Sequence, residues 1–269
     1  MLTKIRFSDF SSYPNLAFKT SLCANGVAVK YLLLFSCLLV APAIMSQTTP
    51  SEANCANTSD EVVAARVKHD VPLDAPHPSK DWERATPVWF CSDWAGKNPD
   101  PGRTTTVRVL WSPQTLYLRF ECKYREITLF PDADSNGRRD HLWDRDVAEA
   151  FLQPDPAKQR YYKEFEVAPN GFWIDLDISP QPAVDLKSGL KRSVWIDEAH
   201  KTWAAELAIP LKALTPSFDP RAVWHVNFYR CEGAKEPRAY LAWRPTNTPE
   251  PNFHVPSAFG KLRFASSKE

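Results

Sequence analysis

The chain has 269 residues, of which 33 are Lys or Arg and 32 are Asp or Glu, leaving a formal net charge of +1. This balance lacks the basic excess typical of nucleic-acid-binding proteins, so no nucleic-acid partner is expected. Charged residues make up 24% and hydrophobic residues 43% of the chain, which is ordinary for a globular protein and excludes a mostly disordered one.

The first predicted element is an apolar run at residues 31–41, which follows Lys19 and Lys30. The run is shorter than the ~20 residues that a bilayer-spanning helix needs, and it is typical of the apolar region of a signal peptide. We therefore expect residues 1–46 to be a signal peptide with an over-extended start. The mature protein is then expected to have no membrane span and to be secreted or periplasmic. An uncleaved N-terminal anchor is the alternative.

Residues 47–65 are small and polar without periodicity, and they predict a linker before a single domain at residues 66–266. Export permits disulfides, and the predicted domain contains Cys91, Cys122 and Cys231. One disulfide with one thiol and three buried thiols are both compatible with this odd number.

In the predicted domain, apolar residues recur mostly with a period of two, which indicates β-strands. Residues 104–122 predict a hairpin that turns at Ser112-Pro113-Gln114. Further strands are predicted at 146–152, 161–168, 172–178, 192–197, 202–209, 223–231, 239–243 and 260–264. Only residues 210–214 are expected to be helical, for a single turn. The pattern predicts an all-β fold, an antiparallel β-sandwich of jelly-roll type.

All ten Trp residues lie between Trp82 and Trp243. Those in alternating strands are expected to fill the core: Trp111, Trp195, Trp203 and Trp224. Trp143, Trp243 and Phe253 instead lie at loop–strand junctions among polar neighbours. A flat aromatic side chain there can cover the apolar face of a sugar ring while nearby polar groups bind the hydroxyls. These three residues are therefore candidate carbohydrate-binding residues.

Four segments, in order, resemble family 9 carbohydrate-binding modules: TTTVRVLWSPQTLYLRFEC (104–122), HLWDRDVAEAF (141–151), WAAELAIPLKAL (203–214) and AWRPTNTPEPNFHVPSAFGKLRF (242–264). The resemblance spans roughly residues 74–264. It implies a jelly-roll sandwich that binds a sugar chain end between two aromatic residues and contains structural calcium. Such modules are often appended to xylanases and other glycoside hydrolases.

The resemblance places the two aromatic residues at Trp143 and at Phe253, where the family has a Trp. It also places Glu149 in the site, and Glu166 where the family has an Arg, with Asn252 available for amide contacts. We therefore expect a non-catalytic module that binds a carbohydrate and supports glycoside hydrolases in the breakdown of xylan- or cellulose-type polysaccharides.

A calcium loop is predicted at residues 132–140. Asp132, Asp134 and Asn136 have the alternating oxygen pattern of such loops, followed by Gly137, and Asp140 occupies a later ligand position. The calcium would be structural. A polar surface turn at Asn136-Gly137 is the alternative.

Three other functions are compatible with parts of the sequence. A glycoside hydrolase would use paired carboxylates, for which Glu164 and Glu166 are candidates two residues apart on one strand. A sandwich that has lost sugar binding would serve as a protein-interaction domain. A haem-binding sandwich is compatible only with His ligation, at His141 or His254, because both Met residues, Met1 and Met45, lie in the expected signal peptide.

Overall fold

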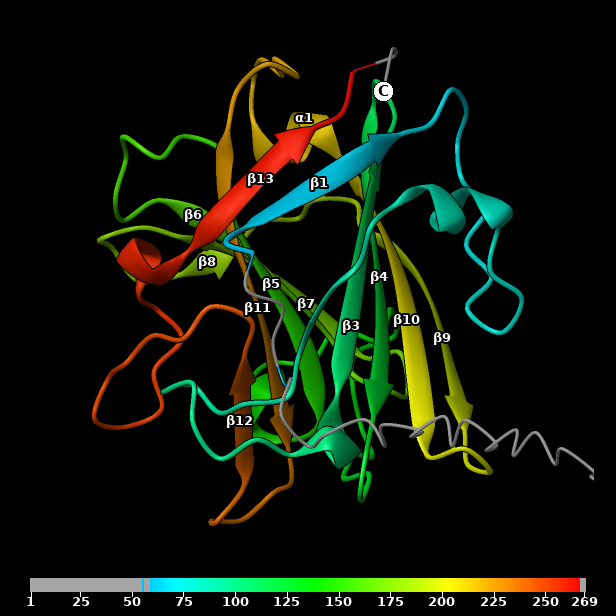
Figure 1. The fold of residues 1–269 in the computed structure, drawn as a ribbon, viewed down its shortest axis with the longest axis vertical. Helices are drawn as coiled ribbons and strands as arrows, with labels where there is room; N and C mark the ends of the chain where they lie inside the picture. Colours follow the sequence, from blue (N-terminus) through cyan, green and yellow to red (C-terminus); the bar gives the residue numbers. More distant parts are fainter. Residues whose placement is uncertain (1–54, 56–58, 267–269) are drawn as a thin grey trace, which may run out of the picture. The chain divides into compact units, whose positions relative to one another are not determined.

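A computed structural model describes Cys55 and residues 59–266 of the protein. These residues belong to the second of two units into which the chain divides, between Gln47 and Thr48. The predicted signal peptide lies outside the described residues. Strands in the described part form two layers (Figure 1), and the expected all-β sandwich is confirmed.

One layer, sheet A, is built around the predicted hairpin. Its strands are β2 (Val88–Phe90), β3 (Thr105–Trp111), β4 (Thr115–Lys123), β10 (Thr202–Pro210) and β9 (Lys191–Asp197). β3 and β4 pair antiparallel, with Trp111 opposite Leu116 across the turn. β10 lies between β4 and β9, so that β9 ends this side of the sheet.

The other layer, sheet B, presents the face on which the site is built. Its strands are β8 (Val184–Asp185), β7 (Trp173–Ile178), β6 (Tyr162–Val167), β5 (Val147–Gln153), β11 (Trp224–Glu232), β12 (Ala239–Ala242) and β13 (Gly260–Phe264). Neighbouring strands from β8 to β13 pair antiparallel, and β12 pairs with β11. β6 and β7 are joined through the predicted turn, where Gly171 has a φ of 83°.

β1 (Glu61–Arg66) joins the two sheets and corrects the predicted domain boundary, because it lies almost entirely within the expected linker 47–65. Residues 61–64 pair in parallel with β13, and residues 65 and 66 pair in parallel with β3. Figure 1 shows β1 and β13 side by side. Val62 and Ala64 are buried in the core between the sheets. Pairing with distant strands thus makes a strand of a segment that has little periodicity of its own.

The few helical elements are short. They are the predicted turn α1 (Leu211–Leu214) and the 3-10 helices η1 (Lys80–Arg84), η2 (Pro101–Arg103), η3 (Leu142–Asp144) and η4 (Pro256–Ala258). No helix in the described part of the chain is long and apolar enough to cross a membrane.

Alternation along the strands produces two apolar layers. On β4, Leu116, Leu118 and Phe120 point into the core between the sheets, as predicted. On β5, Ala148, Ala150 and Leu152 join the same core. Their neighbours Val147 and Phe151 face the opposite way, into a second apolar cluster on the outer face of sheet B. Both faces of sheet B are therefore covered, and the outer cluster surrounds the candidate site.

Three of the four Trp residues expected in the core are buried: Trp111, Trp203 and Trp224. The prediction is wrong for Trp195, which is 40% exposed. Trp195 lies on β9, the last strand of sheet A, and its neighbours Val194 and Ile196 are the residues that pack against the core.

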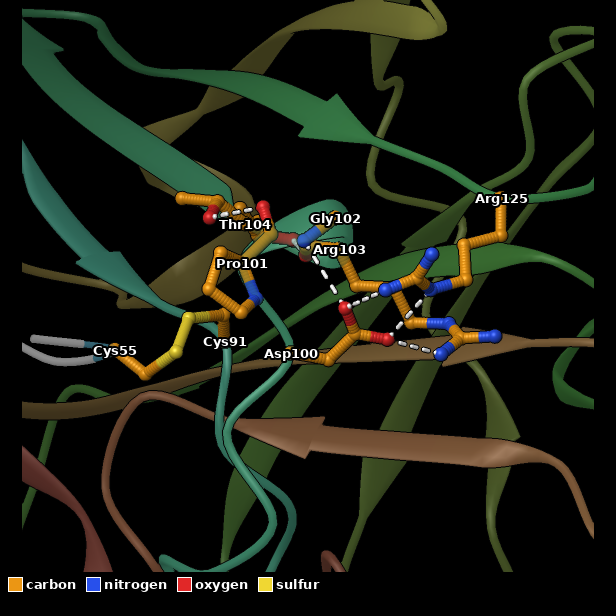
Figure 2. The surroundings of a disulfide bond; sticks show 9 residues. Cys55, Cys91, Asp100, Pro101, Gly102, Arg103, Thr104 and Arg125 are labelled. Carbon is orange, nitrogen blue, oxygen red and sulfur yellow. Dashed lines mark hydrogen bonds and ion pairs between the residues drawn. A yellow bond between two sulfur atoms is a disulfide. The ribbon is translucent and has the colours of Figure 1, made fainter. Parts of the chain in front are cut away.

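A disulfide joins Cys55 to Cys91 (Figure 2), while Cys122 and Cys231 are buried thiols. The sequence left the number of disulfides among Cys91, Cys122 and Cys231 open, and the observed partner of Cys91 lies in the expected linker 47–65 instead. The Cys91 amide also donates to the carbonyl of Cys55 at 2.6 Å. The disulfide therefore fastens the chain before β1 to the segment that follows β2.

Candidate functional site

A cavity of about 310 Å³ opens on the outer face of sheet B. Side chains from β5, β6, β7 and β11 form its floor and walls. Residues of η3 and of the 251–254 loop line it as well, and these two segments lie far apart in the sequence. Asp144, Asn252 and His254 are exposed residues of the lining, so solutes have access to the cavity.

Trp143 lies in η3, whose position is fixed by backbone contacts. The residue before η3, His141, has a left-handed φ of 54°, and its ring lies 4.8 Å from that of Trp143. Nη2 of Arg238 donates to the carbonyls of Trp143 at 2.5 Å and of Arg145 at 3.2 Å. Trp143 is partly exposed and lines the cavity. Its indole is therefore accessible to a ligand, and it is in contact with the His141 ring.

Phe253 comes from the distant 251–254 loop, and its ring is more buried than that of Trp143. Its ring stacks on Tyr229 with centroids 4.2 Å apart and an interplanar angle of 11°. The Tyr229 hydroxyl donates to the Phe253 carbonyl at 3.0 Å. Phe253 is 9% exposed and lines the cavity. Since one face of the ring packs on Tyr229, the remaining surface that a ligand can meet is small.

The polar residues beside Phe253 form a short hydrogen-bonded loop. Oδ1 of Asn252 accepts from the His254 amide at 3.0 Å, which leaves the side-chain amide group of this exposed residue available as a donor. The Tyr162 hydroxyl and Nδ1 of His254 lie 2.6 Å apart. The amide of Asn252 and the imidazole of His254 thus line the cavity beside Phe253, and the buried Tyr162 hydroxyl holds the imidazole.

Three glutamates form the acidic part of the cavity. Glu149 on β5 lies directly opposite Glu166 on β6, and Glu164 points to the same face two residues earlier on β6. One carboxylate oxygen from each of the three lies within 4.8 Å of the other two. All three side chains are buried, at 2%, 3% and 0% exposed for Glu149, Glu164 and Glu166.

Burial raises the pKa of each glutamate, because a charged carboxylate is disfavoured away from water. The pKa of Glu149 is raised to about 8, by burial and then by the neighbouring charge of Glu164. Burial and the charges of Glu149 and Glu164 raise the pKa of Glu166 well above its ordinary value. The pKa of Glu164 is also raised, chiefly by burial. In the absence of a cation, burial therefore disfavours the charged form of all three carboxyl groups.

Five of the six residues predicted to bind the carbohydrate line this one cavity: Trp143, Glu149, Glu166, Asn252 and Phe253. Trp243 is absent from the lining; it is 1% exposed and packs in the core against Phe228. An indole enclosed in that way presents no face to a ligand.

Arg238 and Tyr240 were not predicted to lie in a site, and Glu164 was predicted only as a carboxylate of the alternative hydrolase, yet all three line the same cavity. The Glu-Phe-Glu alternation on β6 was a signal for Glu164, since Glu164 and Glu166 must share a face. Arg238 lies in a loop and has no periodic pattern that would have placed it.

In the predicted calcium loop, the aspartate side chains contact backbone amides and arginines of the loop itself. Oδ1 of Asp134 accepts from the amides of Asn136 and Arg138, both at 2.8 Å. Asp140 pairs with Arg138 at 2.6 Å, and Asp132 lies 3.8 Å from Nε of Arg139. The three aspartates do not form a cluster of convergent ligands, whereas Glu149, Glu164 and Glu166 do, among the residues described. The loop as it stands does not fit a calcium ion.

The fold and the cavity together define a β-sandwich module with an aromatic and acidic pocket on one sheet face. The model of carbohydrate-binding family 9 matches residues 184–264. This match confirms the resemblance to family 9 over these residues, which contain the segments 203–214 and 242–264 of the four that carry it.

Individual proteins show the same likeness. An extracellular protein of Arthroderma benhamiae is 29% identical over 185 residues, which cover 61% of this chain and 80% of the relative. A family 9 module of Caldicellulosiruptor kristjanssonii solved with cellotriose superposes with a TM-score of 0.55 at 13% identity, covering 77% of this chain and 96% of the module. The same module with glucose gives a TM-score of 0.53 at 14% identity, with the same coverage. At these identities the two structures show a shared fold.

Proposed function

We propose that the domain binds a carbohydrate in the cavity on sheet B. The observation that carries this proposal is that Trp143 and Phe253 line the same cavity although they come from distant segments. Partly exposed aromatic surface with polar groups around it suits a pyranose, which has apolar C–H faces and a rim of hydroxyls. The family 9 match and the sugar complexes of modules with this fold support the proposal.

The polar lining offers both donors and acceptors to sugar hydroxyls. The Asn252 amide and the His254 ring are exposed beside Phe253, and Glu149 and Glu166 lie deeper in the cavity. A protonated glutamic acid both donates and accepts, so Glu166 can take the place of the guanidinium that the family resemblance leads one to expect there.

The wider role we propose is that of a secreted module that keeps glycan near glycoside hydrolases during polysaccharide breakdown, with xylan- or cellulose-type chains as the ligand class. The apolar run at residues 31–41, the Cys55–Cys91 disulfide and the extracellular relative support an exported protein.

The experiment is Trp143→Ala, with binding of cello- and xylo-oligosaccharides measured by isothermal titration calorimetry. We expect the variant to lose at least tenfold in affinity, because it removes the accessible aromatic face of the cavity. Trp195→Ala is the matched control, since Trp195 is an exposed indole on sheet A, away from the cavity, and its loss should leave affinity unchanged. Equal binding by Trp143→Ala and the wild type would refute the site.

The geometry favours binding over hydrolysis. Hydrolases place two carboxyl groups on either side of the scissile bond. Here Glu149, Glu164 and Glu166 all point from one face of two adjacent strands. We therefore expect no release of reducing sugar from the same oligosaccharides. Release that is lost in Glu166→Gln would favour the hydrolase instead.

A further inference from the structure

The three glutamates of the cavity lack the cationic partners that the other two buried glutamates, Glu206 and Glu232, have. Glu206 pairs with Arg119 at 2.6 Å, and Glu232 pairs with Arg103 at 2.9 Å and with Arg230 at 3.2 Å. Buried carboxylates are normally compensated in this way, because an unpaired charge in the interior is costly.

Glu166 is the clearest exception. It is fully buried and lines the cavity, and its carboxylate oxygens accept from no donor group; its side-chain contact is with Glu164, a second carboxyl group. Oε2 of Glu164 also has no hydrogen-bond partner; the nearest basic group is Nδ1 of His254, at 4.0 Å. Oε1 of Glu149 accepts only a weak bond from the Cys231 thiol, at 3.4 Å. Arg238 lines the cavity, but its Nη2 donates to two backbone carbonyls of the η3 region.

The positions of the three carboxylates are fixed by the sheet. Glu149 and Glu166 are cross-strand neighbours on β5 and β6, and both strands lie inside sheet B with partners on either side. Side chains on such strands are oriented by the backbone ladder and by packing. The oxygens are therefore held together before any ligand arrives, which lowers the cost of binding one.

The spacing and the chemistry suit a single hard cation. Ca²⁺ binds oxygens at about 2.3–2.6 Å, so two oxygens on one ion lie at most ~5 Å apart. One oxygen from each glutamate meets this limit, since these three oxygens lie within 4.8 Å of one another. Carboxylate-only sets are preferred by Ca²⁺, Mg²⁺ and Mn²⁺ over softer metals.

We propose that Glu149, Glu164 and Glu166 bind one divalent cation of the Ca²⁺ or Mn²⁺ type in the floor of the cavity. The cation compensates the buried carboxylates, and its remaining coordination positions face the cavity, where water or a ligand hydroxyl completes them. All the protein ligands come from β5 and β6, so the site does not require that the cavity bind a sugar.

The test uses the purified protein after dialysis against EDTA, with CaCl₂, MnCl₂ and MgCl₂ added separately. Binding is followed by isothermal titration calorimetry, and for Mn²⁺ also by the loss of the free-ion EPR signal. We expect Ca²⁺ or Mn²⁺ to raise the Tm by roughly 5–10 °C at about 100 times the Kd, because the ion binds only the folded state. Glu166→Gln should weaken this binding at least tenfold.

Two controls keep the result interpretable. Glu166→Gln should be folded in EDTA with a Tm no lower than that of the wild type, because burial already disfavours the charged form of Glu166 and Gln keeps its shape without a charge. Asp132→Asn, in the exposed acidic loop, should bind the metal like the wild type.

Several outcomes would overturn the proposal. They are no binding of any of the three metals, equal metal binding by Glu166→Gln and the wild type, or loss of binding in Asp132→Asn alone. Glutamate-dependent binding of glucosamine, with no metal bound, would also overturn it, since the carboxylates would then recognise an ammonium group. Metal binding in a protein that binds no oligosaccharide would support this site while refuting the sugar-binding function.

Discussion

Asp146 is a buried acid that lies just before β5 and outside the cluster of Glu149, Glu164 and Glu166. It is fully buried, and Oδ1 accepts from the Gly233 amide at 2.7 Å, while Oδ2 has no hydrogen-bond partner. Burial raises its pKa to about 6, although Arg230 lies close enough to oppose the shift and Glu232 adds to it. The folded state therefore holds a proton on Asp146 at a pH where the unfolded chain has released it.

We predict that Asp146→Asn flattens the pH dependence of stability. In the wild type, the contribution of Asp146 is fully present below about pH 4 and is lost as the pH rises through 6, because the folded-state pKa is the higher one. The loss between pH 4 and 7 is on the order of 2 kcal/mol. Asn keeps the acceptor for Gly233 but does not titrate. Urea unfolding of both proteins across this range measures the difference, and parallel curves would contradict the assignment.

At the scale of elements, Arg119 and Glu206 connect two strands of sheet A to the segment that covers them. They lie opposite each other on β4 and β10 and form a buried ion pair at 2.6 Å. Glu206 also accepts from the Asp74 amide at 2.8 Å, and Arg119 donates to the Ala75 carbonyl at 3.3 Å. The pair thus fixes the 74–75 segment to the outer face of sheet A.

Arg119→Met should destabilise the protein by about 3–5 kcal/mol, because it leaves Glu206 as a buried charge without its cation. The double variant Arg119→Met/Glu206→Gln should recover at least half of that loss, since Gln is neutral and still accepts from Asp74. Urea unfolding at pH 7 gives both values. If the double variant is as unstable as the single one, lost packing rather than the uncompensated charge is the cause.

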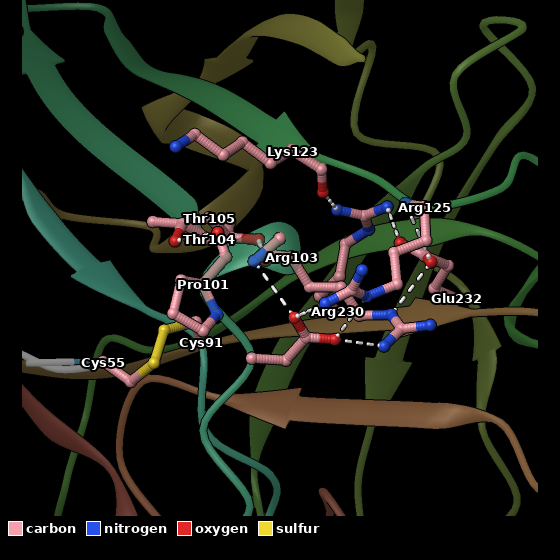
Figure 3. Close-up of polar contacts among 12 residues, drawn as sticks. Cys55, Cys91, Pro101, Arg103, Thr104, Thr105, Lys123, Arg125, Arg230 and Glu232 are labelled. Carbon is pink, nitrogen blue, oxygen red and sulfur yellow. Dashed lines mark hydrogen bonds and ion pairs between the residues drawn. A yellow bond between two sulfur atoms is a disulfide. The ribbon is translucent and has the colours of Figure 1, made fainter. Parts of the chain in front are cut away.

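At the scale of the whole molecule, the Cys55–Cys91 disulfide and several nearby polar contacts link segments that are distant in the sequence. Asp100, whose amide donates to the Cys91 carbonyl, accepts from Nε of Arg125 at 2.8 Å (Figure 2). Beside it, Glu232 of β11 accepts from Arg103, and Arg230 of β11 donates to the Lys123 carbonyl of β4 (Figure 3). Covalent and ionic links therefore join sheet A, sheet B and the chain before β1.

Removing the disulfide by Cys91→Ser should lower the free energy of unfolding by about 3 kcal/mol, because the unfolded chain then gains the freedom of the opened 36-residue span. Thermal unfolding with and without dithiothreitol measures the effect. Dithiothreitol should destabilise the wild type by a similar amount and leave Cys91→Ser unchanged. A wild type that is insensitive to reduction would show that the disulfide contributes little.

Local alternation of side chains was sufficient to predict much of the sandwich. A strand exposes its residues to two faces in turn, so Leu116 and Leu118 had to share a face, as did Glu164 and Glu166. The pattern predicted ten strands and the turn at Gly171 with errors of one or two residues at their ends. It missed three strands of the described chain: β2 and β8, which have only three and two residues, and β1, which lies in the expected linker.

What the sequence determined by itself is the strand content, the face of each side chain and the family 9 resemblance, because these depend on neighbours along the chain. The tertiary structure alone decided that Glu149 meets Glu164 and Glu166, that Trp243 is enclosed and Trp195 exposed, and that Cys55 pairs with Cys91. These outcomes depend on strand register and on which sheet positions become edges. Long-range pairing sets both, since it is the packing of the whole chain, and not any local segment, that buries the apolar surface.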